Sequence, residues 1–144
     1  MATLYSTVYD AAIFNFKDED ILALAELDAD AIMYSYLLKA IADFTYICEK
    51  DLSDRTEASE QFNETLSEVE IQILALGIAV HWTRHQVYFT ENLRDKMSSR
   101  DYSYHSRGNL LASLYDTLKY ITDEYEKKMY DYSYDVGDLS LLKV

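Results

Sequence analysis

The sequence predicts an all-α protein that folds as a small helical bundle. There is no proline and there are only three glycines in 144 residues, whereas strand-rich folds need frequent turns that draw on both. Apolar residues recur with the 3.6-residue period of helices. With 49% hydrophobic residues, the chain is too apolar to stay disordered and is long enough for one sizeable core.

The central element is expected to be an apolar helix at about residues 68–88. Ser67 and Glu70 have the spacing of a capping box, in which a hydroxyl and a glutamate three residues later each accept a hydrogen bond from the other's amide. The run that follows is apolar on nearly every side through Trp82, as expected for a helix surrounded by others. Because charged residues then return, we expect a bend or restart near residues 88–90.

Two further long helices are expected, at about residues 28–49 and 107–133. The first has one apolar stripe with steps of four, four, three and four: Met33, Leu37, Ile41, Phe44 and Cys48. The second has a heptad-like seam: Leu110, Leu114, Leu118, Ile121, Tyr125, Met129 and Tyr132. We expect Ser106 to cap it, after a polar connector at residues 98–107.

The remaining segments are shorter. Residues 4–16 predict a short aromatic helix, and Asp18 can cap a second one that extends to about residue 27. Residues 50–65 are polar and predict a loop that is pinned to the core by Leu52 and Phe62.

The predicted domain organisation is one helical domain at residues 1–133 and a C-terminal docking arm at residues 134–144. Gly137 is expected to end helical structure. The tail beyond it is apolar, whereas termini are usually polar and frayed. Such a tail is typical of an arm that docks on a partner, although it can also pack on its own body.

Tyrosine is unusually frequent, with fourteen residues, and the sequence Asp-Tyr-Ser-Tyr occurs at residues 101–104 and again at 131–134. Tyrosine suits interfaces because its ring offers a large contact area and its hydroxyl a polar tip. The candidate interface residues are Tyr102, Tyr104, Tyr132, Tyr134, Asp138, Leu139, Leu141, Leu142 and Val144.

The net charge of −13 disfavours binding to nucleic acid or to anionic lipids. The most apolar run, residues 71–82, is shorter than the ~20 residues that cross a bilayer. The N-terminus lacks a basic segment followed by a long apolar one, so we expect no signal peptide. These features predict a protein that is made in the cytoplasm and carries no membrane address.

Patterns that carry chemistry are weak. Cys48 is the only cysteine, so the chain can form neither an internal disulfide nor a multi-cysteine zinc site. His81 and His85 have a spacing that can bind metal, but Trp82 stands where a zinc protease places its glutamate. No glycine-rich phosphate loop or strained nucleophile turn is present. We therefore expect no catalytic residue, cofactor or metal; a small enzyme or metal binder that uses the two histidines is the least favoured alternative.

Several stretches, taken in order, resemble one family. They are 51–55 (DLSDR), 66–74 (LSEVEIQIL), His81-Trp82, 92–94 (NLR), 101–106 (DYSYHS), 109–111 (NLL), 132–134 (YSY) and 137–139 (GDL). In this order they are similar to the neck proteins of tailed bacteriophages, the head–tail connector or adaptor subunits. Residues 1–50 take no part in the resemblance.

The resemblance implies a virion protein of the neck, at the head–tail junction. Copies of it would form a ring under the portal protein, join the capsid to tail or stopper proteins, and let genome DNA pass through an acidic bore without specific binding. The net charge leaves a second class open: a soluble acidic interaction or regulatory protein, such as a DNA mimic or inhibitor, that is not incorporated in particles.

Overall fold

The computed structural model describes residues 2–14, 29–96 and 101–136. Within them the chain forms β1 (Thr3–Leu4), α1 (Tyr5–Ile13), α3 (Ala29–Phe44), β2 (Arg55–Thr56), β3 (Gln61–Phe62), α4 (Glu68–Lys96) and α5 (Asp101–Val136). Helices dominate and the strands form only one small sheet, which confirms the predicted all-α bundle. The described helices do not have the length and hydropathy that crossing a membrane requires.

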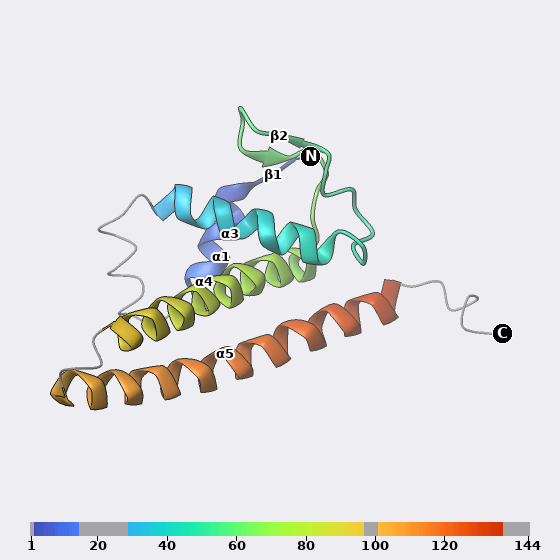
Figure 1. The fold of residues 1–144 in the computed structure, drawn as a ribbon. Helices are drawn as coiled ribbons and strands as arrows, with labels where there is room; N and C mark the ends of the chain where they lie inside the picture. Colours follow the sequence, from blue (N-terminus) through green and yellow to red (C-terminus); the bar gives the residue numbers. More distant parts are fainter. Residues whose placement is uncertain (1, 15–28, 97–100, 137–144) are drawn as a thin grey trace.

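Helix α4 is the central element, as predicted. Figure 1 shows it between α1 and α3 on one side and α5 on the other, and its contacts with these three helices exceed those among them. Every residue from 73 to 80 is buried. Since α4 is covered on several sides, its apolar character all around the helix is explained by position.

The boundaries of α4 and α5 differ from the prediction. Helix α4 continues through residues 88–90 to Lys96 without a break. This stretch has no proline or glycine, so the returning charges do not end the helix. Helix α5 begins at Asp101, so most of the expected connector at 98–107 is helical and Ser106 is not its cap. Gly108 lies inside α5, where it costs about 1 kcal/mol, which a 36-residue helix can absorb.

The C-terminal end of α5 also differs. The helix runs to Val136, so residues 134–136 of the predicted arm belong to it. Residues 137–144, and the short helix predicted near residues 18–27, lie outside the described residues.

Helix α3 ends at Phe44, five residues earlier than predicted. The amide of Cys48 closes a last turn onto the carbonyl of Phe44 at 2.9 Å. The next amide, that of Glu49, donates instead to the hydroxyl of Tyr132 at 2.9 Å. A tertiary hydrogen bond therefore replaces the one that would continue the helix.

The segment predicted as a loop at residues 50–65 contains the small sheet. Strand β3 lies between β1 and β2 and pairs antiparallel with both, with Phe62 opposite Thr3 and Arg55. Leu52 and Phe62 are each 1% exposed, which confirms that they pin the segment to the core. Strands of two residues are too short to show a period of two in the sequence.

Candidate interaction site

The capping box at the start of α4 is present in the structure. The amide of Glu70 donates to Ser67 Oγ at 3.2 Å, and the amide of Ser67 donates to Glu70 Oε1 at 2.7 Å. Each side chain thus satisfies a backbone donor that the helix cannot use itself. Glu70 is only 1% exposed, so its position is fixed inside the protein.

The second oxygen of Glu70 joins α4 to two other parts of the chain. Tyr132 of α5 donates its hydroxyl proton to Oε2 at 2.7 Å, and the Cys48 thiol donates to the same oxygen at 3.4 Å. The Tyr132 hydroxyl in turn accepts the Glu49 amide, and its ring contacts the Phe44 ring edge-on at 5.0 Å. We name this cluster of Cys48, Ser67, Glu70 and Tyr132 the three-helix junction.

The junction determines how its groups ionise. Burial raises the pKa of Glu70, but the hydrogen bonds from Ser67, Tyr132 and Cys48 outweigh burial and hold the pKa below its usual value. Burial and the nearby Glu70 charge raise the pKa of the Cys48 thiol to about 11. Burial and the bond to Glu70 likewise raise the pKa of Tyr132. At neutral pH the junction therefore holds one carboxylate, a neutral thiol and a neutral phenol, which is a structural arrangement without an activated nucleophile.

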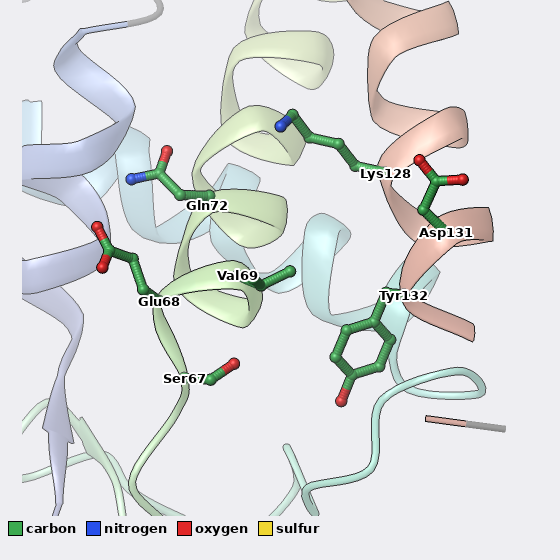
Figure 2. Close-up of a pocket in the computed structure, with 7 residues that line it drawn as sticks. All are labelled: Ser67, Glu68, Val69, Gln72, Lys128, Asp131 and Tyr132. Atoms are coloured by element: carbon green, nitrogen blue, oxygen red, sulfur yellow. The ribbon is translucent and has the colours of Figure 1, made fainter. Parts of the chain in front are cut away.

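A pocket of about 420 Å³ opens beside the junction, between the start of α4 and the end of α5. Its lining is mostly apolar surface and consists of Ser67, Glu68, Val69, Gln72, Lys128, Asp131 and Tyr132. Figure 2 shows Val69 pointing from α4 toward α5 and Lys128 reaching back toward α4. Val69 is 56% exposed, so an apolar side chain is left open to a partner at this point.

A second polar contact joins α5 to the body farther along α4. Asp43 Oδ2 lies 2.7 Å from His81 Nε2 and accepts the Tyr125 hydroxyl at 3.2 Å. Burial and the Asp43 charge raise the pKa of Tyr125, so the phenol stays neutral. The helices meet closely here, because a Cβ on Gly77 would lie 2.6 Å from Ala40 Cβ and 2.8 Å from the Tyr125 hydroxyl.

The candidate interface residues fall in different places. Tyr132 is 6% exposed and its hydroxyl is used internally, so the expectation that it faces a partner is corrected: it packs in the chain's own core and only borders the pocket. Tyr134 is 58% exposed on α5. Tyr102 and Tyr104 lie in the first turns of α5. Asp138, Leu139, Leu141, Leu142 and Val144 lie outside the described residues.

The histidine pair is not assembled as a metal site. His81 faces Asp43, while His85 is exposed with its ring 6.3 Å from that of Tyr36. Among the described residues, no three His, Cys, Asp or Glu side chains are grouped so that they could hold a metal ion.

Sequence reasoning found the capping box but missed the second role of Glu70, the Asp43 contact and the pocket. One signal was present in the predicted heptad-like seam from Leu110 to Tyr132, which we name the inner seam of α5. It contains Tyr125 and Tyr132 among aliphatic residues, and a buried tyrosine hydroxyl needs a partner. The partners themselves are 82 and 62 residues away in the chain, which no local pattern reveals.

Comparisons with protein-family models, with curated proteins and with solved structures found no match for this chain.

Proposed function

We propose that this chain is a structural subunit of a tailed-phage neck, a head–tail connector that binds copies of itself and neighbouring neck proteins. The observation that carries the proposal is a convergence. Two of the stretches that resemble neck proteins are 66–74 and 132–134. Glu70 in the first and Tyr132 in the second are 62 residues apart in the sequence, yet their side chains form a hydrogen bond of 2.7 Å. Resembling stretches thus supply three of the four junction residues and most of the pocket lining, as suits an assembly protein.

The pocket supports a head-to-tail contact between copies. Its α5 residues lie within the last three turns of that helix, which runs to Val136. We propose that the arm at residues 137–144 of one copy occupies this pocket on its neighbour. Its leucines would cover Val69, and Asp138 would approach Lys128. A contact between two different surfaces of identical subunits closes into a ring when the rotation allows.

The acidic chain also suits a channel for DNA. A net charge of −13 repels phosphate, so DNA passing through a ring of such subunits would not adhere. The same charge fits an acidic regulator that stays outside particles, and the two classes differ in where the protein is found.

The decisive measurement is the copy number of this protein in purified virus particles from its source, by quantitative mass spectrometry. One ring of copies per particle supports the connector. Hundreds of copies would indicate a shell or tail-tube protein, and absence from particles would contradict the proposal in favour of the acidic regulator.

Variants then test the pocket. We expect Val69→Asp, which alters an exposed residue, to leave the chain folded but exclude it from particles. Deletion of residues 137–144 should likewise leave the chain folded but exclude it from particles. The deletion begins at residue 137 so that α5, which extends to Val136, stays intact. Tyr88→Asp is the matched control, because Tyr88 is 58% exposed and lies 19 residues farther along the same helix, about 28 Å away. If Val69→Asp enters particles at the normal copy number, the pocket contact is wrong.

A further inference from the structure

The outward side of α5 has a second heptad-like stripe. Its steps are four, three, four, three and four, which keep six residues on one face of a helix. We name it the outer seam: Asp116, Tyr120, Asp123, Lys127, Tyr130 and Tyr134. All six side chains are exposed, and Tyr120 and Tyr130 are 72% and 67% exposed. In Figure 1, α5 is the outermost layer, and no other described element packs on this side.

A stripe of large exposed aromatic residues indicates a binding surface. The order of charges along this stripe indicates what binds it. If two copies of the outer seam lie antiparallel, Tyr120 faces Tyr130 of the partner subunit and Asp123 faces Lys127 of the partner subunit. Asp116 then faces Tyr134 of the partner subunit, whose hydroxyl can donate to it. The twofold axis repeats each of these pairs.

The parallel arrangement lacks this complementarity. In register, each residue of the outer seam would face its own copy, with aspartate against aspartate and lysine against lysine, and like charges in contact are repulsive. We propose that a second copy of this chain binds the outer seam in antiparallel orientation and forms a twofold dimer in solution.

The dimer is expected to be weak and concentration-dependent. The outer seam spans about 27 Å at 1.5 Å per residue, which gives a small interface. Two charge effects oppose pairing: the net charge of −13 on each chain and Glu126, which lies beside the twofold axis and faces its own copy. Removing the second effect with Glu126→Gln should tighten the dimer.

This inference goes beyond the proposed function and does not depend on it. A twofold contact uses the same surface on both copies and cannot by itself close a larger ring. The ring contact proposed above uses the pocket and the arm instead. Failure of the dimer would leave the copy number in particles unaffected, and absence from particles would leave the dimer unaffected.

The first test is analytical ultracentrifugation of the full chain at concentrations up to about 200 µM. We expect Lys127→Glu to weaken the dimer at least about tenfold, because it places glutamate opposite Asp123 at two symmetric positions. The double variant Asp123→Lys/Lys127→Glu restores the pair and should restore dimerisation to within about threefold. Lys39→Glu makes the same charge change at an exposed position of α3, outside both the outer seam and the pocket, and should have little effect.

The second test fixes orientation by cysteine cross-linking. A mixture of Tyr120→Cys and Tyr130→Cys chains should form a disulfide-linked dimer under mild oxidation. Either variant alone should not, because in the antiparallel pair identical positions are about 15 Å apart, too far for a disulfide. Chains with only Cys48 give the baseline. A monomer throughout the concentration range, an unchanged dimer in Lys127→Glu, or cross-linking of Tyr120→Cys alone would each overturn the proposal.

Discussion

The two faces of α5 have nearly the same spacing but opposite environments. The inner seam is aliphatic between its tyrosines, and Tyr125 and Tyr132 are 4% and 6% exposed with their hydroxyls on carboxylates. The outer seam has aspartate and lysine between its tyrosines, and Tyr120 and Tyr130 are largely exposed. Heptad spacing alone therefore does not predict which face is buried. The residues between the tyrosines predict it, because they are aliphatic on the buried face and charged on the exposed one.

The inner face depends most on Glu70, the common acceptor of the three-helix junction. We expect Glu70→Ala to lower the free energy of unfolding by about 3 kcal/mol, because it removes the capping box and leaves the buried Tyr132 hydroxyl without its acceptor. Chemical denaturation measures the effect. Glu68→Ala is the control: Glu68 is exposed in the same first turn, and its loss should cost less than about 0.5 kcal/mol. Equal losses in the two variants would show that the junction is unimportant.

Substitution of Gly77, where two helices approach closely, should cause the next largest loss of stability. Gly77→Ala inserts a methyl group 2.6 Å from Ala40 Cβ and 2.8 Å from the Tyr125 hydroxyl, so a helix must shift. Overpacking costs about 1–3 kcal/mol, partly offset by about 1 kcal/mol of helix propensity, and we expect a net loss of about 1–2 kcal/mol. At exposed Gln72 of α4, the stability difference between Gln72→Ala and Gln72→Gly measures the propensity gain of alanine over glycine without the clash. A Gly77→Ala protein as stable as the parent would contradict the tight helix contact.

The sequence predicted the helices that periodicity and capping specify. The capping box at Ser67 and Glu70 located the start of α4 to the residue, because its pattern is local. Composition predicted the fold class, because the absence of proline means that no position interrupts a helix in that way. The end of α3 was missed because the Tyr132 hydroxyl, 83 residues away, takes the amide of Glu49.

The site was less predictable than the fold. Tyr132 was correctly placed in the inner seam but was also expected at an interface, and one side chain cannot be both buried and free. Val69 and Lys128 line the same pocket, and only the packing of α4 against α5 brings these two residues to one site. The outer seam has charged residues at three of its six positions, so it is not found by a search for apolar stripes.

Removing single hydroxyl groups compares the two faces directly. Tyr132→Phe should cost about 1.5 kcal/mol, because the Glu49 amide and the Glu70 carboxylate both lose a partner. Tyr130→Phe makes the same change on the outer face and should stay within about 0.5 kcal/mol of the parent. Denaturation midpoints of the two variants give the comparison. If Tyr130→Phe cost as much as Tyr132→Phe, the assignment of inner and outer faces would be wrong.

The smallest expected effect is the pH dependence that Glu70 adds to the inner face. Because its pKa in the folded protein lies below the usual value of 4.5, its ionised form stabilises the fold. That contribution is complete above about pH 4.5 and is lost as the pH falls through the lower pKa of the folded state. Glu70→Gln cannot titrate, so the stability difference between parent and variant should shrink as the pH falls from 6 toward 3. Denaturation across this range tests it, with Glu68→Gln as the exposed control. A constant difference would mean that the hydrogen bonds from Ser67, Tyr132 and Cys48 do not favour the carboxylate of Glu70 over its neutral acid.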